Sequence, residues 1–176
     1  MKLIKELIKV YFVFIAVFFI GRLFFYLLHM ERFNHISFSE SMLTFIYGLR
    51  MDTIVISIIL VIPTIILTLS PKLFSKFLSK LLNIYILVFL ILAVFIECAS
   101  FPFFAQYDFR PNYLFIEYLE YPQEVSSLLF KDYKFQFIGA FLIISLVVTL
   151  YIKSKFINFG NVFQQSYVSR ILMLLP

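Results

Sequence analysis

The sequence predicts an all-α integral membrane protein with four transmembrane helices and short interfacial helices. Hydrophobic residues make up 62% of the 176 residues and charged residues 14%, against about 45–50% and about 25% in an average soluble domain. A small domain buries only about 70% of its surface on folding, so this much apolar surface cannot all be hidden from water. The apolar residues also gather in four runs, each close to the length that crosses a bilayer as a helix.

The four spans are predicted at about residues 10–28, 53–69, 81–96 and 135–152 of a single transmembrane domain, residues 1–176. The first span follows the basic segment MKLIKELIK. Its apolar run is too long for a secretory signal peptide, and no small-residue cleavage site follows it. It is therefore expected to stay in the membrane as an anchor. The third span is expected to extend toward Phe104.

Two residues inside the spans need a local explanation. Arg22 lies near the outer end of the first span, where extension of its side chain to the lipid headgroups is favoured over a buried ion pair. Pro63 lies within the second span and is expected to kink it, because proline cannot donate a backbone hydrogen bond.

The residues before the second span are also apolar, from Met42 to Leu49, and the run GLRMD follows at residues 48–52. One straight helix from residue 42 to residue 69 would be about 42 Å long, against a hydrocarbon core of about 30 Å. An interfacial helix near residues 41–49 is therefore expected to lead into the second span. Arg50 and Asp52 would then lie at the level of the headgroups.

The lysines predict the orientation of the chain. Eight of them flank the spans on one side, opposed only by Glu6: Lys2, Lys5, Lys9, Lys72, Lys76, Lys80, Lys153 and Lys155. Residues 97–134, on the other side, contain six acidic and three basic residues, a net charge of −3. The positive-inside rule then predicts a cytoplasmic N-terminus and an external interfacial segment at residues 97–134.

Short interfacial helices are expected within this external segment. Pro111 disfavours the helical conformation at Arg110, and Asn112 can cap a following helix. Helices are predicted at residues 113–121 and, opened by Pro122, at residues 122–130. Tyrosines of the segment would form part of an aromatic belt at the membrane surface: Tyr107, Tyr113, Tyr118, Tyr121 and Tyr133.

The external segment contains most of the candidate contact residues, since charged groups near hydrocarbon usually mark function or a membrane boundary. The planar guanidinium of Arg110 suits a lipid phosphate. Glutamates here could contact an amine, a glycerol or an attached domain, and the alternative is that the charges merely face water. The candidates for contact with an anionic phospholipid headgroup or an attached domain are Arg50, Asp52, Asp108, Arg110, Asn112, Glu117, Tyr118 and Glu124.

Signatures of a catalytic site are absent from the sequence. His29 and His35 are the only histidines and lack a second ligand pair at metal-binding spacing. Cys98 is the single cysteine, which excludes an internal disulfide, and it is expected to be a buried, inert thiol. No catalytic residue, metal ligand or cofactor is therefore expected within these residues. The net charge of +5 is explained by lysines beside the spans, so no nucleic-acid partner is expected.

The C-terminal residues leave two interpretations open. Residues 156–170 are expected to form a polar cytoplasmic stretch. Arg170 is followed by ILMLLP, which predicts the first turns of a fifth span, cut short, from residue 171. The alternative is a short apolar tail on a four-span protein.

Residues 107–125, YDFRPNYLFIEYLEYPQEV, resemble the outer loop of the lipoteichoic acid synthase and phosphoglycerol transferase family, within the alkaline phosphatase and sulfatase superfamily. The resemblance lies in Arg110 with Asn112, in the step Glu117-Tyr118-Leu119 and in the pair Glu124-Val125. The run GLRMD at residues 48–52 is similar to the pattern of this family before its second span.

The resemblance implies five spans in a bacterial cell (inner) membrane, followed by a large external domain. In that domain a threonine nucleophile and a divalent metal, commonly manganese or zinc, move a phospholipid headgroup (phosphoglycerol or phosphoethanolamine) onto an envelope acceptor. The 176 residues would be the membrane anchor, inactive alone, with membrane lipids and the catalytic domain as partners. Two other functions stay open: a stand-alone four-span scaffold or binding protein of the cell envelope, and a small transporter, which the nearly apolar spans disfavour.

Overall fold

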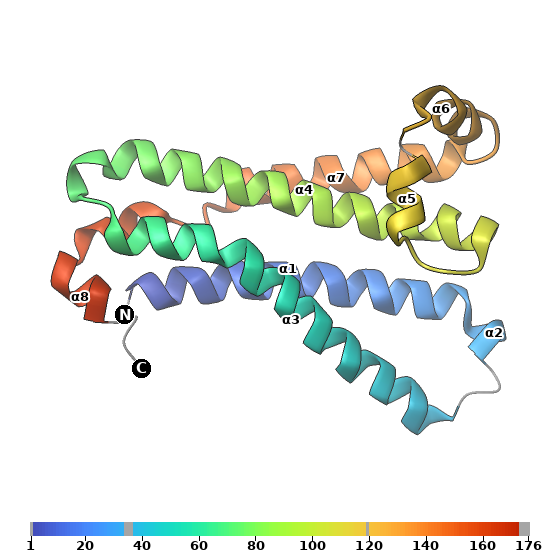
Figure 1. Ribbon diagram of the computed structural model, residues 1–176, viewed down its shortest axis with the longest axis horizontal. Helices are drawn as coiled ribbons and strands as arrows, with labels where there is room; N and C mark the ends of the chain where they lie inside the picture. The colour runs from blue at the N-terminus through green and yellow to red at the C-terminus, as the bar shows by residue number, and fades with distance from the viewer. Residues whose placement is uncertain (1, 34–36, 119, 173–176) are drawn as a thin grey trace.

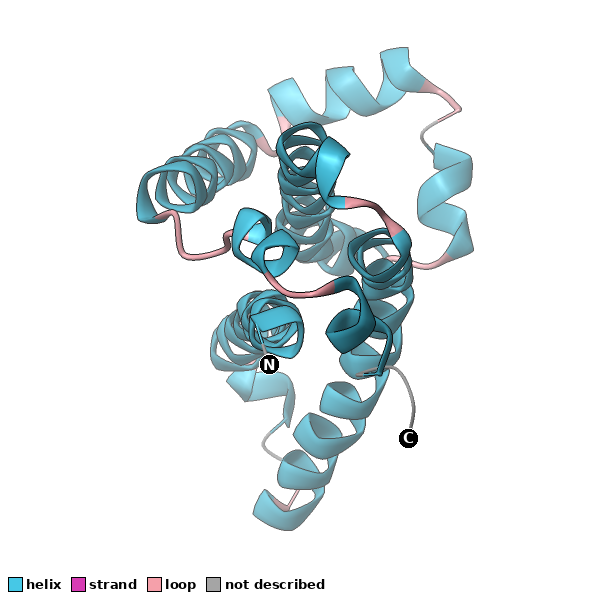
Figure 2. Ribbon diagram, turned by 90° about the vertical axis from the view of Figure 1, so that its left-hand side faces the viewer, coloured by secondary structure: helices cyan, strands magenta, loops and turns pink. Residues whose placement is uncertain are grey.

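The computed structural model describes residues 2–33, 37–118 and 120–172, and it confirms the predicted fold class. Four helices in it are long and apolar enough to cross a membrane. Successive long helices run in opposite directions along the long axis of the molecule (Figure 1). Figure 2 shows that short loops join the helices and that the described residues contain no strand. The four long helices are α1 (Lys2–Leu28), α3 (Phe38–Leu69), α4 (Ser75–Tyr107) and α7 (Lys134–Ser154).

Short elements lie at the two ends of the bundle (Figure 1). They are α2 (Met30–Phe33), η1 (Lys72–Phe74), α5 (Tyr113–Tyr118), α6 (Pro122–Lys131), η2 (Phe159–Gln164) and α8 (Tyr167–Leu172). We call residues 108–133, which join α4 to α7 and include α5 and α6, the hairpin, and the end of the bundle that it covers the hairpin end. Helices lie at both predicted positions in the hairpin, with Pro122 as the first residue of α6, but α5 ends at Tyr118, before the predicted end at residue 121.

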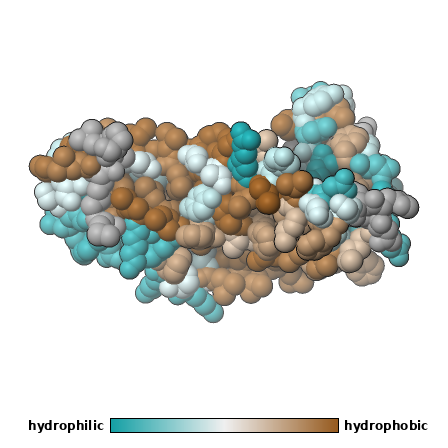
Figure 3. Space-filling view, turned by 90° about the horizontal axis from the view of Figure 1, so that it is seen from below, coloured by the Kyte–Doolittle hydropathy of each residue, from teal (hydrophilic) through white to brown (hydrophobic). Residues whose placement is uncertain are grey.

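The opposite end, which we call the lysine end, contains the start of α1, the α3–α4 connection and the end of α7 (Figure 1). The eight lysines predicted to share one side lie on these segments. Figure 3 shows hydrophobic residues over most of the middle of the molecule, with hydrophilic residues gathered mainly toward its ends. This distribution is the one expected of helices whose middle lies in hydrocarbon.

Packing within the bundle is uneven. Helix α1 contacts both α3 and α4, whereas α7 contacts α4 and the adjoining α6. The core between α1, α3 and α4 includes the fully buried side chains of Val10, Phe14, Ile56 and Ile86. None of the residues of α7, all of which are described, is buried. Helix α7 is therefore a peripheral helix that presents most of its apolar surface to its surroundings.

Helix α3 is one continuous helix of 32 residues, so the prediction of a separate interfacial helix near residues 41–49 is wrong. Ser37 starts the helix with a capping box, in which its hydroxyl accepts from the Glu40 N–H and the Glu40 carboxylate accepts from the Ser37 N–H. This reciprocal bonding satisfies two backbone donors. A helix of this length is longer than the hydrocarbon core is thick. Helix α3 fits because it slopes away from the other long helices toward the hairpin end (Figure 1).

Pro63 lies inside the continuous helix α3. Since proline has no N–H, the carbonyl of Ile59, four residues earlier, loses its helical donor. The Tyr85 hydroxyl on α4 donates to that carbonyl at 3.0 Å. A neighbouring helix thus satisfies the backbone group that the proline leaves free, as membrane helices require.

The segment after α7 folds back across the lysine end. The expectation that this segment is polar is wrong for its buried aromatic residues, and its cytoplasmic location stays a prediction. Phe159, Val162 and Phe163 are at most 1% exposed. The buried carboxylate of Glu6 accepts from the backbone N–H of Asn158 at 2.9 Å. Hydrophobic side chains in this segment have no helical period, so their burial was not evident from the sequence.

Arg170 on α8 is 1% exposed. It attaches the end of this segment to α3. Its guanidinium donates to the carbonyls of Leu67 at 2.6 Å and Ser70 at 3.0 Å. These carbonyls lie at the C-terminal end of α3, where backbone acceptors lack helical donors and a positive charge is favourable. Helix α8 ends at Leu172, and residues 173–176 of the predicted fifth span lie outside the described residues.

Candidate functional site

The hairpin half of the bundle contains three ion pairs between different segments, of which the Arg32–Asp108 pair is exposed and the other two are partly buried. Arg22 on α1 donates from Nη2 to both carboxylate oxygens of Asp52 on α3, each at 2.8 Å. Arg110 in the hairpin donates from Nη2 to Oε2 of Glu97 on α4 at 2.8 Å, and it lies over the ring of Phe25 at 5.3 Å. Glu97 also interacts electrostatically with Arg22 and Asp52. The four charges therefore form one neutral group, which we call the charge cluster.

The expectation that Arg22 extends to the headgroups is wrong. Its side chain is 13% exposed and that of Asp52 is 12% exposed, so the pair is nearly buried. The reason is that Asp52 lies near the middle of the continuous helix α3 instead of at a helix end. Opposite charges that pair inside a bundle avoid the cost of leaving either one alone in hydrocarbon.

Two glycines leave space for the charge cluster. A Cβ atom at Gly21 on α1 would lie 2.8 Å from Cδ of Glu97, and one at Gly48 on α3 would lie 2.6 Å from Nε of Arg22. Any larger residue would force Glu97 or Arg22 to move, because such distances are shorter than van der Waals contact. At both positions close approach, not an unusual backbone conformation, requires the absence of a side chain.

Polar contacts also hold the first part of the hairpin against the bundle. Asp108 ends α4 in the left-handed conformation, with φ 60° and ψ 16°, and its N–H donates to the Phe104 carbonyl at 2.9 Å. The Asp108 carboxylate pairs with Arg32 on α2. The predicted capping role of Asn112 is confirmed, since its Oδ1 accepts from the Leu114 N–H at 3.0 Å.

The predicted candidates do not gather into one site. Asp52 belongs to the charge cluster, and three hairpin candidates (Asp108, Arg110 and Asn112) hold the hairpin in place. Arg50 on α3 and Glu117 on α5 are exposed. The side chains of Tyr118 and Glu124 lie outside the described part of the structure. Arg110 keeps 39% of its side chain exposed, so contact with a lipid phosphate stays a prediction.

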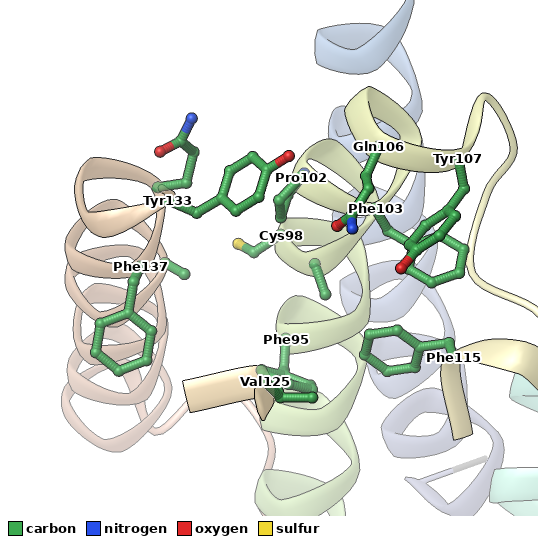
Figure 4. Close-up of a pocket in the computed structure, with 13 residues that line it drawn as sticks. Phe95, Cys98, Pro102, Phe103, Gln106, Tyr107, Phe115, Val125, Tyr133 and Phe137 are labelled. Atoms are coloured by element: carbon green, nitrogen blue, oxygen red, sulfur yellow. The ribbon is translucent and has the colours of Figure 1, made fainter. Parts of the chain in front are cut away.

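A cavity with a volume of about 140 Å³ lies beside α4, between the hairpin and α7. Figure 4 shows Phe95 and Val125 at one end and Gln106, Tyr107 and Tyr133 at the other. Most of the lining is apolar, with aromatic rings from α4, α5 and α7. Ligand pockets are lined mainly by apolar groups, so this lining suits an apolar group, and a volume of about 140 Å³ admits only part of a larger molecule.

Cys98 lies in the wall of this cavity, and in Figure 4 its thiol points from α4 toward α7. It is half-buried, whereas the sequence predicted a buried thiol. The difference arises because Cys98 faces the cavity between α4 and α7. The cavity was not predicted from the sequence. The one sequence feature that could have indicated it is the pair of small residues Ala99 and Ala140, which line the cavity from α4 and α7.

Among the described residues, no three His, Cys, Asp or Glu side chains lie close enough together to hold a metal ion. The charge cluster has two arginines for its two carboxylates, which favours ion pairing within the protein. The sequence matches no protein-family model, and no solved structure matches the chain.

Proposed function

We propose that the chain is the membrane anchor domain of a bacterial envelope enzyme that moves a phospholipid headgroup, phosphoglycerol or phosphoethanolamine, onto an acceptor. In this proposal the lysine end faces the cytoplasm and the hairpin end faces outward, in the cell (inner) membrane. The observation that supports it best is the arrangement of the hairpin. The segment that resembles the outer loop of the transferase family is fixed to one end of a four-helix membrane bundle, opposite the lysines.

The contacts of the hairpin suit the role of a fixed support. Arg110 pairs with Glu97 on α4, and Asp108 pairs with Arg32 on α2. The outer surface of α5 and α6 stays exposed and includes Tyr113, which is 67% exposed. A rigid platform with an exposed aromatic and acidic surface fits contact with an attached domain, since aromatic residues are enriched at interfaces.

The chemistry would belong to a catalytic domain outside these 176 residues. The nucleophile and the manganese or zinc ion are assigned to that domain, and the anchor alone would be inactive. The anchor would contribute by keeping the active site near the outer membrane surface, where the donor lipid lies. A positioned enzyme and a membrane-bound donor meet at a high effective concentration.

The mass of the native product tests this proposal. An immunoblot of source-cell membranes, with an antibody to an epitope near the N-terminus, should show a band far above 20.9 kDa. Protease added outside intact cells should then release a soluble fragment and leave a membrane-bound one. A band at 20.9 kDa would contradict the proposal and favour the alternative, a stand-alone four-span scaffold or binding protein of the cell envelope.

A further inference from the structure

We propose that the cavity beside α4 holds one acyl chain of a phospholipid from the membrane leaflet at the hairpin end. This inference is independent of the proposed transferase, because it rests on the cavity and not on a catalytic domain. The walls come from α4 and α7, two helices apolar enough to span a membrane. Residues of the hairpin complete the lining, so the cavity lies at the hairpin end of these helices, beside the predicted membrane surface.

The lining selects for an apolar chain. The rings of Phe95, Phe103, Phe115 and Phe137 surround the space, and such a surface does not hold ordered water, which needs two to four polar partners. Empty space of this size would leave the lining side chains without contacts on one side. A flexible chain from the bilayer can fill it without leaving the membrane.

The open side of the cavity explains how the chain enters. Helix α7 has no buried residue, and α4 is the long helix that it contacts most. The neighbouring residues of α7 are apolar and exposed, for example Phe141 and Leu142 at 67% and 62%. A chain can therefore pass between α4 and α7 from the surrounding lipid without crossing a polar surface.

One end of the cavity is polar and suits the headgroup. Gln106 and Tyr107 on α4 and Tyr133 beside α7 lie on the two sides of this end in Figure 4, and hydroxyl and amide groups bond glycerol and ester oxygens. Lys131 and Lys134 flank Tyr133 in the sequence and are exposed. Helix α7 begins here with no acidic residue in its first turn and no side-chain cap, so its N-terminus is a positive end.

The lysines beside the start of α7 favour an anionic headgroup at this end of the cavity, against the net charge of −3 of residues 97–134 as a whole. A lipid phosphate would meet two lysines and the start of α7, with Asp132 as the single acidic residue in residues 131–136. The bound molecule would place its chain along Cys98 and its phosphate beside Tyr133. The occupant is thus a diacyl phospholipid with an anionic headgroup, held by chain and headgroup together.

Photo-crosslinking in lipid bilayers tests this inference. The full chain is reconstituted in phosphatidylcholine vesicles with a trace of phosphatidylglycerol that has a diazirine on one acyl chain. After illumination, mass spectrometry should place the label on the cavity faces of α4 and α7. Ala140→Leu should reduce labelling about tenfold, because extra methylenes in a filled space are strongly unfavourable.

The matched control is Gly139→Leu on the same helix. A Cβ at Gly139 meets nothing within 4 Å, so this variant adds the same side chain to α7 outside the cavity and should label as the wild type does. Ala99→Leu fills the cavity from α4, so the result does not depend on the folding of one variant. Labelling spread evenly over all four spans, or unchanged in both filling variants, would overturn the inference.

The single cysteine provides a second readout. In detergent, addition of phosphatidylglycerol should slow the reaction of Cys98 with an uncharged maleimide severalfold, because the bound chain covers the thiol. Equal protection by diacylglycerol would overturn the part of the inference that assigns the phosphate. Crosslinks that join two copies of the chain through the cavity, with no lipid label, would show that a second copy occupies the cavity. That result would overturn the entire inference that a lipid binds there.

Discussion

Replacing Asp52 by leucine would leave the guanidinium of Arg22 nearly buried without its partner. Arg22 makes both of its described hydrogen bonds to Asp52, each at 2.8 Å. Its Nη1 atom is already buried with no hydrogen-bond partner in the described structure. Removal of one member of a buried ion pair costs about 3–5 kcal/mol, because the remaining charge stays desolvated.

We expect a loss near the lower limit, about 3 kcal/mol, for Asp52→Leu. The Arg22 side chain is 13% exposed, and its long stem lets it turn toward the membrane surface once the pair is broken. A loss of this size raises the ratio of unfolded to folded protein about 10²-fold. The assay is reversible unfolding in mixed detergent micelles with increasing dodecyl sulfate, followed by circular dichroism.

A double variant separates the ion pair from the packing. Arg22→Met with Asp52→Leu replaces both charges by apolar side chains and should recover most of the loss, since apolar replacements of buried pairs are often neutral. Arg50→Leu is the control, because Arg50 is exposed on the same helix; it should change stability by less than about 0.5 kcal/mol. A loss below about 1 kcal/mol for Asp52→Leu, or a double variant no more stable than the single one, would refute the reasoning.

Two further predictions concern the backbone acceptors of α3. Tyr85→Phe should lower stability by about 1–3 kcal/mol, because it leaves the Ile59 carbonyl unsatisfied, and Pro63→Ala in the same background should recover most of that loss; no recovery would contradict the assignment. Arg170→Met removes two bonds from a buried guanidinium to carbonyls at the end of α3, each worth about 1.5–3 kcal/mol. It should release the C-terminal segment, detected as faster tryptic cleavage after Lys155 in vesicles with the lysine end exposed, and an unchanged cleavage rate would show that the segment is held by other contacts.

Much of the architecture could be predicted from the sequence because its signals are local. The length and hydropathy of each apolar run depend on consecutive residues, and these predict a spanning helix without any knowledge of its neighbours. The hairpin helices were also predicted from local signals: Asn112 caps α5 and Pro122 opens α6. The distribution of lysines to one end likewise needs only the order of the spans.

The sites depended on the rotation and crossing of the helices, which hydropathy does not contain. Arg22 meets Asp52 across 30 positions, and Arg110 meets Glu97 across 13. An apolar span is compatible with any rotation about its axis, so the sequence could not predict which charge faces which. Gly21 and Gly48 acquire their role only when Glu97 and Arg22 lie against them.

The sequence alone therefore determined that this chain is a four-span helical membrane protein with eight of its ten lysines at one end and short helices at the other. Only the tertiary structure decided that its charges pair inside the bundle, that the segment after α7 is buried, and that a cavity opens beside Cys98. The physical reason is that hydrophobic burial in lipid acts on each span separately, whereas pairing, close approach and cavities arise from contacts between helices.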